Sequence, residues 1–288
     1  MSDPVFSSDS GASGPARIAL EVEYDGANFH GWQRQSSPQL PTVQGAMEKA
    51  LSQVADYPIQ LICAGRTDTG VHATAQVVHF DAAVDRGARA WLRGGNSLLP
   101  AGVRIHWART VDDTFHARFS ALSRRYRYVI LESDVAPALL SRQVTHVRGH
   151  LDTGAMQRAA DALPGEHDFS AFRAAGCQSR SPFRYVSHLR VFRQGCFVVI
   201  DIAANAFLQH MVRNIAGTLI TVGLGQRDCD WPGQLLAGRD RRRSAATASP
   251  AGLYLVAVDY PKAFGLPEAA SGPFFLDIEA SGKTPPAS

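Results

Sequence analysis

Each half of the chain contains strands with a two-residue period beside helices, and this arrangement constrains the possible folds most. Residues 18–24 carry an apolar side chain at every second position, which is typical of a half-buried strand. In the second half, residues 185–193 and 196–203 alternate in the same way around the turn Gln194-Gly195, which predicts an antiparallel hairpin. We therefore expect an α+β fold of hairpins and crossing helices, and not a doubly wound parallel sheet.

The remaining periodic segments give the two halves a similar organisation. Helical spacing predicts one helix after Thr42 and another after Asp152 or Thr153, with these side chains as N-caps. A third helix carries an apolar stripe from Leu208 onwards and ends at Gly223. The other predicted elements are strands at 59–64, 75–80, 103–107, 124–131 and 253–260 and a helix at 88–98. The chain is accordingly divided into a disordered tail (1–14), two α/β lobes meeting at a cleft (15–114 and 115–264) and a flexible tail (265–288).

Composition is that of an ordinary globular protein, with 45% hydrophobic and 19% charged residues. No basic segment precedes an apolar one near residue 1, and the apolar stretches are too short to span a bilayer, so we expect no membrane segment. The sequence contains neither a zinc-binding histidine pattern nor a P-loop nor a G-x-G-x-x-G motif, so we expect no metal or nucleotide cofactor. The scattered cysteines predict reduced thiols in a cytoplasmic protein: Cys63, Cys177, Cys196 and Cys229.

The basic residues are almost all arginine, since only three of the 29 are lysine, and the net charge is +3. Two clusters occur, at 118–127 beside aromatic residues and at 239–243. Arginines next to aromatics suit contact with phosphates and stacking on bases. A short charged run is more often a solvated surface. Composition therefore permits a nucleic-acid partner without establishing one.

The loop Gly65-Arg66-Thr67-Asp68-Thr69-Gly70 carries the main candidate for catalysis. The glycines let the backbone approach a ligand, and Arg66 can keep a nucleophilic Asp68 carboxylate ionised. From these residues alone, Asp68 could equally cap its own turn. Asp68-Thr69-Gly70 also matches the aspartic protease motif. That chemistry needs a second such motif and a shared proton, which the neighbouring arginine opposes.

Further motifs occur in a fixed order over residues 17–262. They are Tyr24-Asp25-Gly26, Gly31-Trp32-Gln33-Arg34-Gln35, the Asp68 loop followed by Val71-His72-Ala73, Phe115-His116-Ala117-Arg118, Arg124-Arg125-Tyr126-Arg127-Tyr128, and Phe207-Leu208 with His210-Met211-Val212-Arg213-Asn214. Together they resemble the tRNA pseudouridine synthase A family, and a set of this length is far more specific than the Asp68 motif alone.

The resemblance implies a pseudouridine synthase fold, with two ferredoxin-like α/β lobes and mixed, mainly antiparallel sheets flanking a central active-site cleft. It implies an enzyme that isomerises uridine to pseudouridine at positions 38, 39 and 40 in the tRNA anticodon stem-loop, without a metal or cofactor. It also implies a homodimer that binds tRNA. The alternative is a non-catalytic tRNA-binding or chaperone protein on the same fold, against which the intact catalytic residues argue.

The resemblance also assigns roles to individual residues. Asp68 is the expected nucleophile, and the sequence leaves open whether it adds to the ribose, adds to the uracil ring or assists glycal formation. Arg66 is expected to hold or replace the flipped base, and Arg213 to pair with Asp68 and orient it. Tyr126 is expected to stack on the uracil and is a candidate to take the C5 proton, with Leu208 beside it in the pocket. The expected tRNA contacts are Trp32, Arg34, Gln35, His72, Arg118, Arg125 and Arg127.

Overall fold

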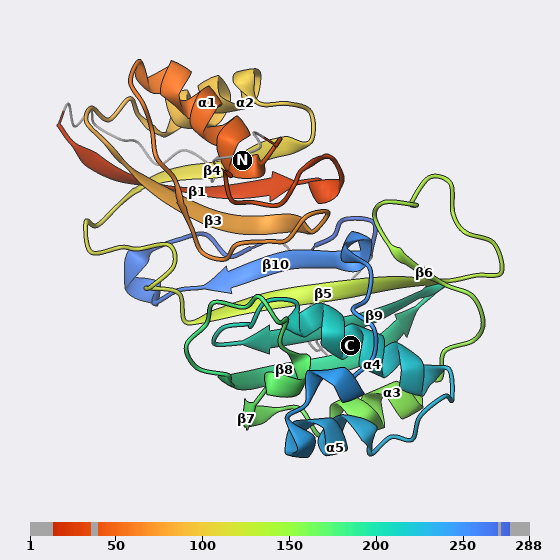
Figure 1. Cartoon of the computed structure of the whole chain (residues 1–288). Coiled ribbons are helices and arrows are strands. Elements are labelled where there is room, and N and C mark those ends of the chain that lie inside the picture. The colour runs from red at the N-terminus through yellow and green to blue at the C-terminus, as the bar shows by residue number, and fades with distance from the viewer. Residues whose placement is uncertain (1–13, 36–39, 270–271, 277–288) are drawn as a thin grey trace, which may run out of the picture.

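The computed structural model describes residues 14–35, 40–269 and 272–276, and in them ten strands form one mixed sheet (Figure 1). The order is β4-β1-β3-β10-β5-β9-β8-β7, with β2 paired to β3 and β6 paired to β5. Only the pairs β10–β3 and β5–β6 of these strands are parallel, which confirms the expected α+β class with a mainly antiparallel sheet. The strands are β1 (Ala16–Tyr24), β2 (Ile62–Cys63), β3 (His72–Ala82), β4 (Val103–Val111), β5 (Ser123–Glu132), β6 (Thr145–Val147), β7 (Gly165–Asp168), β8 (Phe183–Gln194), β9 (Phe197–Ala204) and β10 (Leu253–Asp259).

The first and third helices begin at the predicted caps. Thr42 Oγ1 accepts a hydrogen bond from Gly45 N at 3.2 Å, and an Asp152 carboxylate oxygen accepts one from Ala155 N at 2.9 Å. No helix in the described residues is both long and apolar enough to cross a membrane. The α-helices are α1 (Val43–Ala55), α2 (Gly95–Leu98), α3 (Thr153–Ala160), α4 (Met211–Gly223) and α5 (Trp231–Gly238). Short 3₁₀ turns occupy Gly26–Asn28, Ser170–Phe172, Arg241–Arg243, Pro250–Gly252 and Lys262–Phe264.

Some elements differ from the prediction. In place of a regular helix at 88–98 there is a π-helical turn, Ala90–Gly94, followed by the single turn α2, because adjacent glycines weaken the helix there. The strand predicted at 59–64 is paired only at Ile62–Cys63. Helix α4 begins at Met211, so Leu208, the first residue of the predicted apolar stripe, lies before the helix. Strands β6 and β7 and helix α5 have no counterpart in the prediction, since they are short and lack a clear apolar period.

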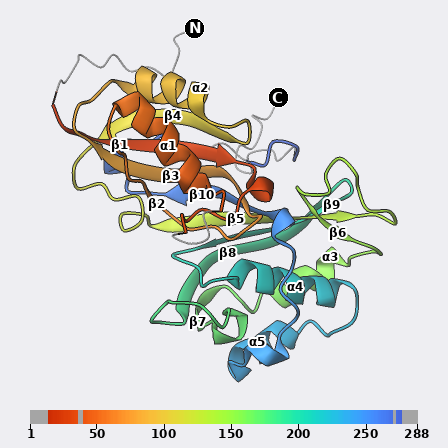
Figure 2. The same cartoon turned by 45° about the horizontal axis from the view of Figure 1, so that its top comes forward.

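The α-helices pack on one face of the sheet, α1 and α2 over the first half and α3, α4 and α5 over the second (Figures 1 and 2). Alternation along β5 assigns its residues to the two faces. Tyr126, Tyr128 and Ile130 point into the core beneath the helices, whereas Val129 and Leu131 belong to a cluster on the other face. The core beneath the helices is continuous between the two halves of the chain.

A turn at residues 272–276 covers part of the opposite face. Leu276 is 4% exposed and packs behind β5, β9 and β10, and the ring of Phe275 lies 5.8 Å from that of Phe197. This part of the tail predicted at 265–288 therefore belongs to a core, and residues 277–288 lie outside the described residues. The tail predicted at 1–14 lies outside the described residues apart from its last residue.

The two halves of the sheet are joined at β10. This strand pairs with β5 along most of its length but with β3 through only two residue pairs, Tyr254–His72 and Leu255–Ala73. Further along, β2 pairs with the edge of β3, so β3 and β5 diverge. The sheet thus continues across the lobe boundary predicted at residues 114 and 115, and the division into two lobes stays a prediction.

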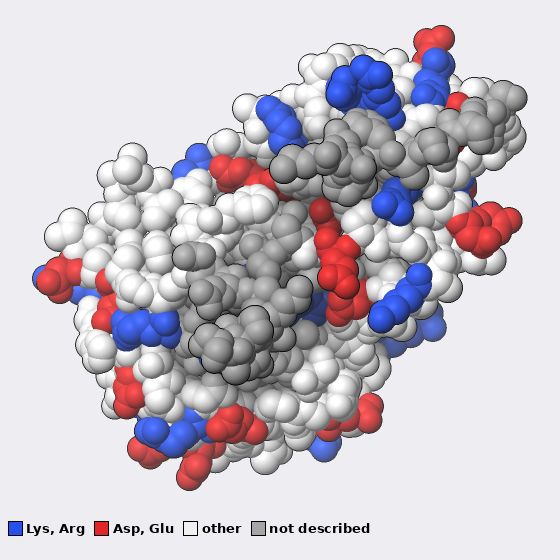
Figure 3. All heavy atoms as spheres, turned by 180° about the vertical axis from the view of Figure 1, so that it is seen from behind, with Lys and Arg blue, Asp and Glu red and all other residues white. Residues whose placement is uncertain are grey.

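Charged side chains of both signs are interspersed on the side of the molecule that faces away in Figure 1 (Figure 3). Near the middle of this side, acidic side chains gather in a row (Figure 3). A row of carboxylates repels polyanions such as nucleic acids. This side is therefore a less favourable surface for RNA than one where arginines face solvent without acidic neighbours.

Glu21 on β1 makes stability depend on pH. It is 7% exposed, and burial raises the pKa of its carboxyl group from 4.5 to about 7. Because the folded state binds this proton more tightly than the unfolded chain, stability falls as the pH rises from 4.5 to 7 and stays lower above that. We expect Glu21→Gln to raise the free energy of unfolding by up to about 3 kcal/mol at pH 8 and by much less at pH 5.

Urea denaturation of the two proteins at both pH values measures this effect. The matched control is Glu23→Gln on the same strand, whose carboxylate lies 2.6 Å from His106 Nε2. Because this substitution removes a favourable contact, it should not stabilise the protein at pH 8. Stabilisation of the same size by both substitutions would contradict the assignment to buried Glu21.

Candidate active site

The loop between β2 and β3 is fastened to the first half of the sheet on both sides of Asp68. The Tyr24 hydroxyl lies 2.8 Å from Thr67 Oγ1, and the backbone N–H of Trp32 donates to the Thr67 carbonyl at 3.0 Å. After Asp68, the Val71 N–H donates to the Asp68 carbonyl at 3.1 Å and closes a turn. Asp68 is therefore presented from a loop whose neighbours are fixed, which a positioned nucleophile requires.

Two further residues let the loop lie this close to the sheet. Gly31 has φ +84°, and a Cβ atom there would stand 2.7 Å from the Thr67 carbonyl oxygen, so only glycine fits. Gln76 is fully buried, and its Nε2 donates to the Gly65 carbonyl at 2.6 Å while its Oε1 accepts from the Gly65 N–H at 3.3 Å. These contacts satisfy the backbone of Gly65 without regular secondary structure.

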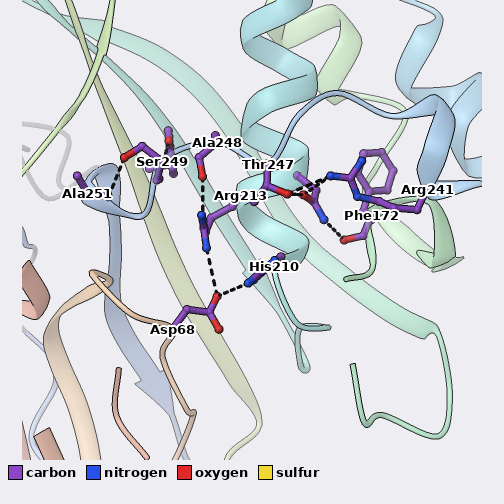
Figure 4. A network of polar contacts seen from close by, with 11 residues as sticks. Asp68, Phe172, His210, Arg213, Arg241, Thr247, Ala248, Ser249 and Ala251 are labelled. Atoms are coloured by element: carbon purple, nitrogen blue, oxygen red, sulfur yellow. Dashed lines mark hydrogen bonds and ion pairs between the residues drawn. The ribbon is translucent and has the colours of Figure 1, made fainter. Parts of the chain in front are cut away.

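Two nitrogen groups approach the same carboxylate oxygen of Asp68 (Figure 4). Arg213 Nη1 lies 3.7 Å from Oδ2, and His210 Nε2 lies 3.5 Å from Oδ2. The side chain of Asp68 remains 30% exposed, whereas that of Arg213 is 13% exposed. In both pairs the nearest carboxylate oxygen is Oδ2, so Oδ1 is the oxygen farther from the two nitrogens.

The start of α4 brings both groups to Asp68. His210 has φ +61°, an uncommon left-handed conformation for a residue with a side chain, and Arg213 follows it by three residues, which places both on one side of the helix. Arg213 Nε donates to the Ala248 carbonyl at 2.8 Å, and the Ala248 N–H donates to the Arg213 carbonyl at 3.2 Å. These two bonds direct the guanidinium toward Asp68 (Figure 4).

The segment that carries Ala248 is anchored through Asn214. Asn214 is fully buried, and its Oδ1 accepts from Thr247 Oγ1 at 2.7 Å and from Arg241 Nη2 at 2.9 Å, while its Nδ2 donates to the Phe172 carbonyl at 2.7 Å. Arg241, from the second arginine cluster, therefore has a structural role. The network ties the segment before β10 to α4 and so supports the Ala248 contact.

Tyr126 lies on the helix face of β5, near the Asp68 loop. It is 8% exposed, and its ring packs edge-to-face on Phe207 with centroids 5.1 Å apart. Burial, and next the negative charge of Asp68, raise the pKa of the Tyr126 hydroxyl above its ordinary value. The side chain is thus a protonated phenol at neutral pH, with the shape and polarity to stack on a planar ligand.

Arg124, two residues earlier on the same face of β5, joins three loops. It is 9% exposed, and its guanidinium donates to the Ala64 carbonyl at 3.0 and 3.3 Å, to the Arg118 carbonyl at 2.6 Å and to the Asn205 carbonyl at 3.0 Å. Ala64 begins the Asp68 loop, and Asn205 begins the segment that leads to α4. Arg124 therefore fixes the two sides of the candidate site relative to each other.

The structure brings four of the predicted residues together and leaves one apart. Asp68, Arg213 and Tyr126 are neighbours as described, and Leu208, 3% exposed, belongs to the same core just before α4. Arg66 is exposed, and within the described ranges it makes no hydrogen bond or ion pair. The cation at Asp68 is therefore Arg213 and not the closer residue in sequence, and the role of Arg66 stays a prediction.

The structure uses Arg125 and Arg127 in ion pairs with one carboxylate, and their contacts with RNA stay predictions. Both side chains lie on the face of β5 opposite Tyr126 and pair with Asp201, at 2.7 Å and 3.1 Å. Arg127 is 4% exposed and also donates to the Gly272 carbonyl at 2.6 Å. Arg125 is partly exposed, but its guanidinium is engaged by both oxygens of Asp201. The two-residue period of the strand is the reason: neighbours of a site-facing tyrosine must face away.

Trp32 and His72 are buried in structural contacts, and the structure gives no support to their predicted contacts with RNA. Trp32 is 1% exposed and packs in the core beneath the helices. His72 is 2% exposed, its Nδ1 accepts from the Gly26 N–H at 3.1 Å, and its ring stacks on that of Tyr254 with centroids 4.7 Å apart. By contrast, Arg34, Gln35 and Arg118 are exposed, and their contacts with RNA stay predictions.

The sequence-based assignment misses two residues of the site, His210 and Arg124. A signal for each is present in the sequence. His210 precedes Arg213 by three residues, which is one helical turn, and Arg124 precedes Tyr126 by two, which is one strand period. Among residues 14–35, 40–269 and 272–276, no group of three or more His, Cys, Asp or Glu side chains is arranged to bind a metal.

Comparison with known proteins gives consistent matches over most of the chain. The model of a family described as tRNA pseudouridine synthase matches residues 21–120 and 159–261, which include Asp68 and Arg213. A tRNA pseudouridine synthase A of Photorhabdus laumondii is 55% identical over 260 residues, covering 90% of this chain and 98% of that protein. Another, of Photobacterium profundum, is 57% identical over 260 residues, with 90% and 99% covered.

The contacts of Arg124 predict that lysine cannot replace it. An ammonium group has three donors at one point and cannot reach carbonyls in three loops, so Arg124→Lys leaves buried carbonyls unpaired. We expect a loss of about 2–3 kcal/mol in the free energy of unfolding, measured by urea denaturation. Arg118→Lys, on an exposed side chain of the adjacent loop, serves as the control and should change stability by less than about 0.5 kcal/mol. Equal stability of the two variants would show that Arg124 does not hold the loops.

Proposed function

The chain belongs to the tRNA pseudouridine synthase family, and from this premise we propose that it isomerises uridine to pseudouridine in tRNA with Asp68 as nucleophile. The observation that carries the assignment is the geometry of Asp68. A carboxylate at the junction of the two halves of the chain lies beside Arg213 and His210, which approach it at Oδ2. Contacts of this kind hold the carboxylate in one position, as nucleophilic attack requires.

The isomerisation of uridine needs a nucleophilic group such as this carboxylate and no redox partner. The bond between C1′ of the ribose and N1 of the uracil breaks, the base turns, and C1′ is joined to C5. C5 loses a proton and N1 takes one up, so substrate and product are isomers. Asp68 supports this by adding to C1′, by adding to the uracil ring or by assisting formation of a glycal. In each route the C5 proton is lost to solvent, so its release reports the reaction whichever route is followed.

Tyr126 is proposed to stack on the target uracil. Its ring lies beside the Asp68 loop and is held by Phe207, so its position is fixed before substrate binds. Because burial and Asp68 raise the pKa of its hydroxyl, Tyr126 is poorly suited to take the C5 proton as a phenolate. The structure thus supports the stacking role over the role of base. Leu208 is proposed to pack against the uracil from the side of α4.

The target base has to leave its helix to reach Asp68, because the carboxylate lies in a loop between packed halves of the protein. Flipping a base out costs a few kcal/mol, which contacts with the displaced strand must offset. Arg66 is two residues from Asp68 and points into solvent, so we propose that it takes the place of the flipped base or holds it.

The substrate position is proposed as 38, 39 and 40 in the anticodon stem-loop, on the strength of the motifs shared with the tRNA pseudouridine synthase A family. RNA is expected on the side of the Asp68 loop and α4. The opposite side, with its row of acidic side chains (Figure 3), would repel phosphates. We further propose that the protein acts in the cytoplasm, as expected for an enzyme that modifies tRNA.

Replacement of Asp68 by asparagine tests the function and the nucleophile together. Asparagine has nearly the same shape but is not a nucleophile, so we expect Asp68→Asn to bind tRNA within about threefold of the wild type and to form no pseudouridine. Tritium release from tRNA transcripts containing 5-³H-uridine measures turnover, and filter binding measures affinity. Transcripts with uridine replaced by cytidine at one of positions 38, 39 and 40 locate the modified sites.

The outcomes separate the alternatives. Release by the mutant at the wild-type rate would keep the function and refute Asp68 as nucleophile. No release from a folded wild-type protein that binds tRNA would favour the non-catalytic tRNA-binding protein. Asp25→Asn is a matched control, because Asp25 is a partly exposed carboxylate that caps the Gly26–Asn28 turn and lies beside His72 Nδ1 at 3.1 Å. It should retain tritium release.

We also propose that the protein is a homodimer that binds tRNA across both copies. The loop between β5 and β6 supports a contact between copies, because it exposes the apolar side chains of Val135 (79%) and Leu139 (94%). Sedimentation equilibrium should give twice the mass of one chain, and Leu139→Asp should shift the equilibrium toward the monomer. Leu122→Asp, at another exposed apolar position (59%), is the control. A monomer at all concentrations would overturn the proposal.

A further inference from the structure

The segment between β4 and β5 presents an aromatic side chain to solvent. Phe119 is 77% exposed. A single exposed apolar residue needs no explanation by itself. Phe119 is informative because of the structure that holds it, the groups that surround its ring and its connection to the Asp68 loop.

His116 fixes the turn that carries Phe119. Its Nδ1 accepts hydrogen bonds from the backbone N–H groups of Arg118 and Phe119, each at 3.1 Å. Ser120 closes the turn, since its N–H donates to the His116 carbonyl at 2.9 Å and its Oγ accepts from the His116 N–H at 3.0 Å. Four hydrogen bonds within five residues hold the ring in place before any ligand binds, which lowers the entropy cost of binding.

The ring of Phe119 is flanked by groups that favour stacking. The His116 ring lies 4.4 Å away at an interplanar angle of 29°, and the Arg118 guanidinium carbon lies 5.6 Å from the ring centroid. Burial, and next the charge of Arg17, lower the pKa of His116, so its imidazole is neutral near pH 7 and Nδ1 stays an acceptor. Phenylalanine, histidine and arginine are the side chains on which unpaired RNA bases stack.

This turn is fastened to the catalytic loop through Arg124. Arg124 Nη2 donates to the Arg118 carbonyl at 2.6 Å and to the Ala64 carbonyl at 3.0 Å. Ala64 precedes Asp68 by four residues, which span at most about 14 Å. The turn is thus close enough for one RNA strand bound at Asp68 to reach Phe119 as well.

The charge around the turn suits an RNA strand. Arg66 and Arg118 are exposed, and within the described part of the chain neither has a carboxylate oxygen within 4 Å. Arg17 is different, because it is paired with Asp81 at 2.7 Å. Guanidinium groups without a carboxylate partner are free to bind phosphates. Phosphate contacts with these arginines would hold an RNA strand near the ring of Phe119.

We propose that His116, Arg118 and Phe119 form a subsite that stacks an unpaired base of the tRNA near the target uridine. The proposal rests on the proposed function and adds a second base-binding position to it, distinct from Tyr126. The subsite accepts any base, because every base has a π face. By holding a neighbouring nucleotide, it keeps the strand in register while the target base is turned at Asp68.

Binding of an anticodon stem-loop transcript to Phe119→Ala and Phe119→Trp tests the protein side. Loss of base–aromatic stacking should weaken binding of Phe119→Ala about 5- to 100-fold, whereas Phe119→Trp should bind within about twofold of the wild type. Phe183→Ala removes another exposed phenylalanine (49%), on β8, and should leave binding unchanged. Unchanged binding by Phe119→Ala would overturn the proposal.

Transcripts with one abasic nucleotide test the RNA side. If Phe119 stacks on a base, removal of that base should weaken wild-type binding, and Phe119→Ala should then have no further effect. If Phe119→Ala weakens binding to every abasic transcript by the same factor, stacking on a base is refuted. If Phe119→Ala changes the sedimentation of the free protein, the ring packs against a second copy, and the proposal is also refuted.

The same measurements keep this proposal separate from the proposed function. A wild-type protein that binds the transcript but releases no tritium would refute the synthase function. The comparison of Phe119→Ala with abasic transcripts would still report whether a base stacks on this ring, because it depends on binding alone. Activity in the wild type with no effect of Phe119→Ala on binding would leave the function and remove the subsite.

Discussion

The buried guanidinium of Arg124 is the interaction on which the arrangement of the site depends. It lies where β3 and β5 diverge and donates to carbonyls of three loops, at Ala64, Arg118 and Asn205. A planar group with five donors can satisfy three loops at once, and no other side chain can. The Asp68 loop from one half of the chain and the segment leading to α4 from the other are thereby fixed to one strand. Asp68 and Arg213 meet because their supports share this residue.

The motif Arg124-Arg125-Tyr126-Arg127 on strand β5 contributes alternate residues to the candidate site and to a structural ion pair. Arg124 and Tyr126 face the site, whereas Arg125 and Arg127 face the other side and hold the buried carboxylate of Asp201. The two arginines lower the pKa of Asp201 against the effect of burial, so it remains ionised. Removal of one partner of such a buried group costs far more than the intact pair contributes. A motif rich in arginine is therefore mainly a structural element here.

Sequence predicts the features of this protein that depend on local spacing. The caps Thr42 and Asp152, the hairpin of β8 and β9 and the loop of Asp68 all follow from residues near one another in the chain. Contacts between distant segments do not follow in this way. Spacing alone suggests Arg66 as the partner of Asp68, and only the resemblance to a known family indicates Arg213, which is the cation that reaches the carboxylate from the other half of the chain. The burial of Trp32 and Arg127 likewise depends on which face of the sheet is covered, and local composition does not contain that information.

The contacts of Asp68 suit a nucleophile that must later act as a leaving group. In a route through an ester with the ribose, Oδ1 forms the bond and the carboxylate loses its charge. The Arg213 guanidinium then lies beside Oδ2 without its anionic partner, so it favours the return to the free carboxylate. This route requires that return in every cycle, because C5 of the turned base displaces the carboxylate oxygen from C1′. A cation beside the non-attacking oxygen makes the carboxylate a weaker nucleophile, and it also makes the carboxylate a better leaving group.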